Sequence, residues 1–206
     1  MRKVTSLGAF FLVVLTTAVF SMAQAPAPSK LPAMHDSYSL FDAEAENISK
    51  IPYFMVASVS ETPDNLAIKE IIKQNLFAKG YSYKPLTKPE KNVVMFMFTS
   101  TREIRSTEIY TDEQAYAATA QIYRDYVATA QTMSPDVRDV SRNNLVRRST
   151  VVAPVQLLTI WGYIYADDNT LKEVWEGGAA SIEGTAQALP DLAQQAINNF
   201  PQQTPK

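Results

Sequence analysis

Residues Leu157–Ser181 read LLTIWGYIYADDNTLKEVWEGGAAS, two apolar runs on either side of a short polar segment. The runs Leu157–Ala166 and Leu171–Ser181 have the length and the β-branched and aromatic content that are typical of strands. The residues between them, Asp167–Thr170 (DDNT), are typical of tight turns. We therefore expect an antiparallel hairpin, and we build the rest of the fold around it.

The segments before and after this hairpin carry their own start and stop signals. We expect strands over residues 50–60, 93–99 (continuing into 104–110) and 145–153, helices over residues 62–80, 111–133 and 190–201, and a polar, turn-rich segment over residues 134–144. Thr62 and Pro63 are typical of a helix start, and Gly80 of a helix end. The sequence Thr111–Gln114 (TDEQ) has the pattern of a capping box.

This order of elements predicts an α+β protein. The order is β-α-β-α-β-β-β-α, and the simplest way to bury its apolar faces is one mixed or antiparallel sheet with helices packed mainly on one face. We expect a single domain over residues 38–202, preceded by a flexible tether rich in proline and alanine over residues 24–37.

The first residues have the pattern of a secretory signal peptide. Arg2 and Lys3 precede an apolar run from Leu7 to Phe20, which would form about 21 Å of helix, short of the roughly 30 Å that a bilayer core requires. We expect a signal peptide over residues 1–23, cleaved between Ala23 and Gln24. The chain is then a periplasmic or secreted protein, soluble after cleavage, with no transmembrane segment in its mature part.

Composition narrows the classes of function. The chain has no cysteine, one histidine (His35) and a net charge of −2. Zinc and copper sites draw on cysteine and histidine ligands, so we expect no metal and no cofactor. A chain of this charge is not suited to binding nucleic acid. Calcium held by the Asp167–Asn169 turn is an alternative to a simple turn, and we prefer the turn.

Two regions of the domain resemble a known family. One is Asn75–Tyr81 (NLFAKGY) at a helix end, and the other is Glu173–Gly177 (EVWEG), followed by a helix that ends in Asn199–Pro201 (NFP). Together they resemble a widespread family of small bacterial envelope proteins, many of them lipoproteins, whose domain has no assigned function. The lipoprotein cysteine is missing here, and residues 111–133 with the basic stretch after them look like an insertion. The resemblance implies an envelope location and a fold, and no catalytic residue.

The sequence offers no catalytic constellation. The spacings typical of serine nucleophiles and of phosphate-binding loops are missing. Glu173 paired with Glu176 or Glu183 would be candidates for acid–base chemistry. Glu173 and Glu176 are an odd number of residues apart, however, and a regular strand would place them on opposite faces. We therefore expect no catalytic residue and no enzymatic activity.

A basic stretch is the feature of the sequence that most suggests a binding surface. It contains four arginines: Arg138, Arg142, Arg147 and Arg148. Arginine binds oxyanions through two parallel hydrogen bonds, so these residues are candidates for contact with anionic headgroups or an acidic partner. The alternative is a solvent-exposed loop and edge strand whose charges prevent edge pairing. A second candidate is a helix face with Tyr110, Tyr116, Tyr123 and Tyr126, for contact with glycan or protein or simply for packing.

The leading hypothesis is an exported, non-enzymatic protein that binds or assists another envelope component. Its partner would be an envelope protein, a lipid headgroup or a glycan. Two alternatives are a cofactor-free hydrolase that uses carboxylates on cell-wall or lipid material, and a structural subunit of an envelope assembly. Two close carboxylates with raised pKa would favour the hydrolase.

Overall fold

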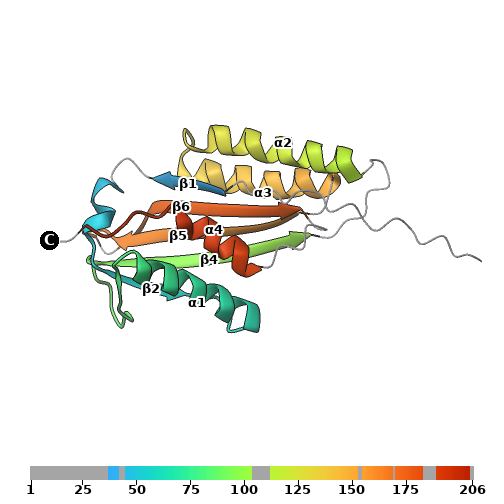
Figure 1. Cartoon of the computed structure of the whole chain (residues 1–206). Helices are drawn as coiled ribbons and strands as arrows, with labels where there is room; N and C mark the ends of the chain where they lie inside the picture. Colours follow the sequence, from blue (N-terminus) through green and yellow to red (C-terminus); the bar gives the residue numbers. More distant parts are fainter. Residues whose placement is uncertain are drawn as a thin grey trace, which may run out of the picture.

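The computed structural model describes residues 37–41, 45–103, 112–152, 155–168, 170–182 and 189–204. Within these ranges the chain forms one mixed six-stranded sheet in the order β1-β6-β5-β4-β2-β3, with helices packed against it (Figure 1). This confirms the predicted α+β class. The predicted signal peptide, its Ala23–Gln24 cleavage site, the tether and His35 lie outside the described residues.

The predicted hairpin forms the centre of the sheet. Strands β5 (Val155–Tyr165) and β6 (Leu171–Ile182) pair antiparallel. The Ala166 N–H donates to the Thr170 carbonyl at 2.9 Å, and Asp168 Oδ1 accepts from the Thr170 N–H at 2.9 Å and from its hydroxyl at 2.6 Å. Asp168 thus closes the turn with its own side chain, as the turn interpretation requires.

The other strands extend this hairpin to both sides. Strand β4 (Val93–Glu103) pairs antiparallel with β5, and β2 (Tyr53–Ala57) lies parallel to β4. The parallel pair is joined by helix α1 (Pro63–Ala78), which begins after the expected N-cap Thr62, and by the two-residue strand β3 (Ser82–Tyr83). At the other edge, β1 (Ser37–Phe41), which the sequence did not predict, pairs antiparallel with β6. A 3-10 helix (Ala45–Lys50) follows β1.

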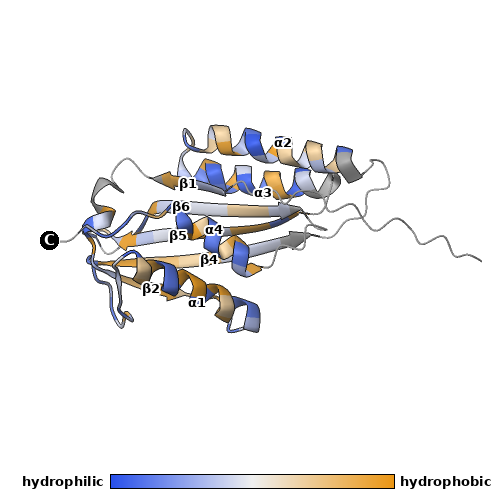
Figure 2. Ribbon diagram, in the orientation of Figure 1, coloured by the Kyte–Doolittle hydropathy of each residue, from blue (hydrophilic) through white to orange (hydrophobic). Residues whose placement is uncertain are grey.

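One face of the sheet carries the larger apolar core. Helices α1 and α4 (Leu189–Asn198) pack on this face. At its centre Phe96, Trp175 and Phe200 meet edge to face, with ring centroids 5.0 to 6.0 Å apart. Gly177 lies where α4 approaches most closely, because a Cβ there would stand 2.4 Å from the Ala196 carbonyl oxygen. Figure 2 shows β4 and much of α1 in hydrophobic colours.

The opposite face carries a helical hairpin, α2 (Asp112–Ala130) and α3 (Pro135–Val152). Two predictions were wrong here: residues 134–144 are not a turn-rich loop, and the described part of the predicted 145–153 strand, residues 145–152, is helical. The buried face of α3 carries four residues at helical spacing: Arg138, Arg142, Leu145 and Ser149. This face looks polar in the sequence because its two arginines pack against carboxylates rather than against apolar side chains. Helices therefore cover both faces of the sheet, not mainly one.

The described helices do not meet the requirements of a membrane span. None of those in the ranges given above has both the length and the apolarity needed to cross a bilayer.

Candidate functional site

A β-bulge in β6 brings two glutamates onto the same face. Gly162 pairs with Trp175 and Tyr163 pairs with Glu173, so Val174 has no partner residue in β5. Val174 and Trp175 both pack into the core under α4. As a result Glu173 and Glu176 both face α3, whereas the sequence analysis assumed a regular strand and placed them on opposite faces.

Two arginines of α3 meet these glutamates in the interior. Arg138 Nη2 lies 2.7 Å from Glu173 Oε1, and Arg138 Nε lies 3.5 Å from Glu176 Oε2. Arg142 Nη1 lies 3.2 Å from Glu176 Oε1, with side-chain exposures of 10% and 1%. Removal of one partner from an ion pair this deep strongly destabilises the protein, because the other charge is left buried and uncompensated. The network therefore ties α3 to β6.

Arg142 has two further contacts at the edge of the network. Its Nη2 lies 2.5 Å from Asp139 Oδ1 on the same helix, and its guanidinium lies 4.6 Å from the centroid of the Trp161 ring. Burial by itself would lower the pKa of Arg142. Glu176 and Asp139 outweigh that effect, and the pKa is raised. Arg142 is thus a fixed cation enclosed by two carboxylates and an aromatic ring.

Two tyrosines complete the surroundings of Glu176. The Tyr38 hydroxyl donates to Glu176 Oε1 at 2.7 Å, and the Tyr126 hydroxyl lies 3.5 Å from the same atom. Burial, followed by the nearby Glu176 charge, raises the pKa of Tyr38 well above its ordinary value, and the same two causes raise the pKa of Tyr126 to about 12. Both hydroxyls therefore stay protonated and act as hydrogen-bond donors at neutral pH.

Glu173 is a buried carboxyl whose surroundings shift its pKa. Burial raises its pKa, and Glu176 adds to this effect, while the hydrogen bond from Arg138 opposes it. A carboxyl with a raised pKa is a proton donor or acceptor closer to neutral pH. Chemically, the network can hold α3 in place, and Glu173 can exchange a proton.

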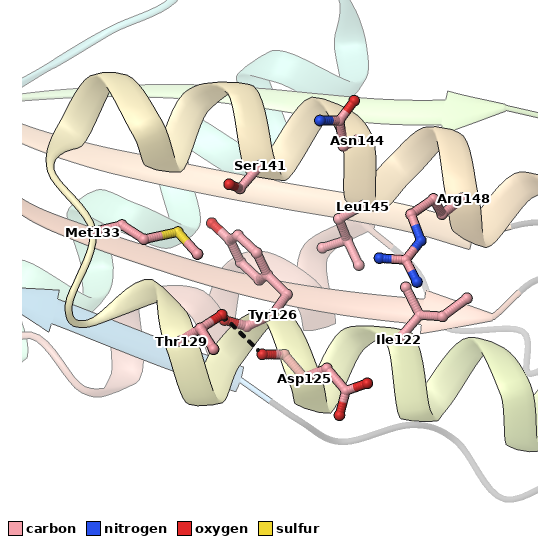
Figure 3. Close-up of a pocket in the computed structure, with 9 residues that line it drawn as sticks. All are labelled: Ile122, Asp125, Tyr126, Thr129, Met133, Ser141, Asn144, Leu145 and Arg148. Atoms are coloured by element: carbon pink, nitrogen blue, oxygen red, sulfur yellow. Dashed lines mark hydrogen bonds between the residues drawn. The ribbon is translucent and has the colours of Figure 1, made fainter.

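An open pocket lies between α2 and α3, on the outer side of this network. It has a volume of about 310 Å³. Its lining combines apolar, hydroxyl, amide and charged side chains: Ile122, Asp125, Tyr126, Thr129, Met133, Ser141, Asn144, Leu145 and Arg148 (Figure 3). Tyr126 belongs both to this lining and to the surroundings of Glu176, so it connects the pocket to the network.

The four arginines of the basic stretch are divided by the structure. Arg138 and Arg142 are buried in the network, whereas Arg147 and Arg148 are exposed on α3. Arg148 reaches the pocket. The spacing of Arg138, Arg142 and Leu145 was the signal that could have revealed a buried helix face. No comparable sequence signal marked Glu173 and Glu176, because the bulge in β6 is not visible in the sequence.

The tyrosine-rich face is also mainly interior. Tyr123 and Tyr126 are buried, Tyr116 is half-buried, and Tyr110 lies outside the described residues. The packing interpretation of this face therefore holds for Tyr123 and Tyr126. Among the described residues, no group of three or more acidic or histidine side chains is arranged to hold a metal ion.

Comparisons with known proteins bear on the fold. No family model and no curated protein match the chain, so its resemblance to envelope lipoproteins stays a prediction. A PDZ domain protein from Parabacteroides distasonis has a similar structure, with a TM-score of 0.50 and 12% identity over 82% of this chain. The matched region is 36% of that protein's length, and at such identity the likeness shows the fold alone.

Two structures of the PelC dodecamer from Paraburkholderia phytofirmans superpose less well. Their TM-scores are 0.37 and 0.36, with identities of 11% and 13%. Each match covers 83% of this chain and nearly the whole of the PelC chain, 98% and 99%.

Proposed function

We propose that the protein is an exported, non-enzymatic component of the bacterial envelope that binds or assists another envelope component through its α2–α3 hairpin. Export is supported by the basic start and the short apolar run that ends at Phe20. Binding is supported by one observation above the others, the open pocket between the two helices.

The charged network supports this function by holding the hairpin in one position. Arg138 and Arg142 form buried ion pairs with Glu173 and Glu176 beneath α3. A pocket on a helix held in this way is formed before its ligand arrives. Such preorganisation lowers the cost of binding.

Capture from envelope extracts tests this function. The immobilised protein is compared with a Ser141→Tyr variant, whose ring would fill the pocket without changing the charge. We expect a component that the unaltered protein retains, that rebinds saturably after purification, and that the variant fails to retain. Equal retention by both proteins would show that the pocket has no part in binding.

A second candidate is the carboxylate hydrolase, and the bulge is the observation that favours it. It places Glu173 and Glu176 on one face, and burial raises the pKa of Glu173. Raised pKa values are typical of catalytic acids. Incubation of the protein with cell-wall and lipid fractions tests this candidate, because Glu173→Gln should abolish any hydrolysis, and circular dichroism verifies that the variant is folded. Hydrolysis that persists in this variant would remove Glu173 from the mechanism.

A further inference from the structure

The chemistry of the pocket distinguishes Arg148 from the other arginines of α3. Arg138 and Arg142 each have carboxylate partners. Arg148 lines the pocket and has no hydrogen-bond or ion-pair partner among the residues that the structure describes. Figure 3 shows its guanidinium extending from α3 toward α2, beside Ile122. It is thus an arginine whose donors remain free for a ligand.

The walls beside Arg148 are apolar. Ile122 of α2, Leu145 of α3 and Met133, between the two helices, contribute aliphatic and thioether groups to the lining. Burial of apolar ligand surface against such groups is favourable, at roughly 25 cal/mol per Å². A suitable ligand therefore carries an apolar part next to the group that meets Arg148.

The polar groups of the lining do not compete for Arg148. The Asp125 carboxylate accepts a hydrogen bond from Gln121 Nε2 at 2.6 Å, and in Figure 3 it points away from α3. The Thr129 hydroxyl donates within its own helix, to the Asp125 carbonyl at 3.0 Å. Ser141 and Asn144 remain as neutral hydrogen-bonding groups on α3. An oxyanion at Arg148 would thus meet the guanidinium, with the neutral Asn144 one turn away on α3, while the Asp125 carboxylate of the lining points away from this helix.

The volume of the pocket limits the ligand's size. At about 310 Å³ it lies at the lower end of the range for small-molecule sites, roughly 300–1,000 Å³. It has room for one headgroup and a short aliphatic chain, not for a folded partner.

We infer that the α2–α3 pocket binds an oxyanion, a carboxylate or a phosphate, attached to an aliphatic chain, with Arg148 as the anchor. This inference rests on the proposed function and specifies the chemistry of what the hairpin binds. Guanidinium groups hold carboxylates and phosphates through two parallel hydrogen bonds, while the chain lies along Ile122, Met133 and Leu145. A cationic amphiphile would meet Arg148 as a like charge.

Titration calorimetry with octyl phosphate tests the inference. We expect saturable binding by the purified protein, weaker binding of inorganic phosphate, which has no chain, and no binding of octylammonium. Arg148→Gln should lower the affinity for octyl phosphate about tenfold or more, since charge-assisted hydrogen bonds are among the stronger ones. Arg147→Gln is the matched control, because it removes the same charge from the preceding residue of α3, which lies outside the pocket lining. This variant should leave the affinity for octyl phosphate unchanged.

Three results would overturn the inference. The first is that octyl phosphate fails to bind. The second is that Arg147→Gln weakens the binding of octyl phosphate as much as Arg148→Gln does, and the third is that octyl glucoside binds as tightly as octyl phosphate. In each case Arg148 is a solvent-exposed charge only. Arg148 is exposed, so its variant should fold, and thermal unfolding followed by circular dichroism verifies this.

Vesicles separate the two sources of such a ligand. Phosphatidylglycerol vesicles that bind the unaltered protein but not Arg148→Gln indicate a lipid headgroup, with phosphatidylcholine vesicles as the uncharged control. Binding of octyl phosphate without binding to vesicles indicates a soluble amphiphile. If the capture experiment succeeds and octyl phosphate does not bind, the inference fails alone; if no component is captured at all, the proposed function fails.

Discussion

Glu176 shows how one residue can contact several elements of the fold at once. Its Oε1 atom faces the Tyr38 hydroxyl at 2.7 Å, Arg142 Nη1 at 3.2 Å and the Tyr126 hydroxyl at 3.5 Å. These three groups come from β1, α3 and α2. A single carboxylate oxygen of β6 thus joins the neighbouring strand of the sheet to both helices packed over it.

Removal of the arginine in this group should be costly. We expect Arg142→Ala to lower the free energy of unfolding by about 3–5 kcal/mol, because it leaves Glu176 buried with less compensation. Urea unfolding measures the effect. Arg148→Ala, an exposed change on the same helix, should stay within about 0.5 kcal/mol. A small effect of Arg142→Ala would mean that the buried charges contribute little to stability.

Gly177 is a second residue whose size is dictated by its neighbours. A Cβ there would stand 2.4 Å from the Ala196 carbonyl oxygen and 2.4 Å from the Trp175 ring. We expect Gly177→Ala to lower the free energy of unfolding by about 1–3 kcal/mol, because α4 must move away from the sheet. Gly162→Ala is the control in the adjacent strand, where the nearest atoms lie at 3.5 Å. Equal destabilisation by the two changes would contradict the steric explanation.

At the scale of elements, the attachment of α3 to β6 depends on protonation. Glu173 has a raised pKa in the folded protein, relative to an ordinary value of 4.5. Between these two values the folded state binds more protons than the unfolded state, so this group's contribution to stability decreases as the pH rises through that window. The contribution is largest below pH 4.5, where Glu173 is protonated in both states.

The matching prediction compares the unaltered protein with Glu173→Gln, which does not titrate at this position. The difference in unfolding free energy, unaltered minus variant, should fall as the pH rises from 4.5 toward the raised pKa. Urea unfolding at a series of pH values measures it. A difference that rises over this range would show that Arg138 dominates and that the folded-state pKa of Glu173 is lowered.

At the scale of the whole molecule, the two faces of the sheet differ in what they bury. The α1–α4 face contains three mutually packed aromatic rings and many aliphatic side chains, whereas the α2–α3 face contains a smaller cluster of tyrosines, alanines, leucines and valines beside the charged network. Apolar burial is the main source of stability. The α2–α3 layer should therefore be the weaker of the two.

Hydrogen exchange tests this difference. We expect the amides of α2 and α3 to exchange through a partial opening, at a lower free energy than those of β4, β5 and α4, which should require global unfolding. Binding of octyl phosphate should slow exchange in α2 and α3 selectively. Equal protection of all helices would show that both layers unfold as one unit.

Much of this architecture could be predicted from the sequence, because it depends on local patterns. The β5–β6 hairpin follows from two strand-like runs and the DDNT turn, and α1 follows from Thr62, Pro63 and Gly80. The class of the fold follows from the order of these elements. Such features depend on residues that are close in the chain, so they can be read without a tertiary structure.

The remaining features depend on what lies opposite in space. Residues 134–153 looked like a loop and a strand because Arg138 and Arg142 stand where apolar residues would mark a buried helix face, and the glutamates that compensate them come from β6. Those glutamates share a face only because Val174 bulges out of register with β5. The sequence by itself therefore determined the hairpin, the helix starts and the α+β class. The tertiary structure alone decided which charges are buried and which arginine remains free, because the compensation of a buried charge is a contact between distant segments.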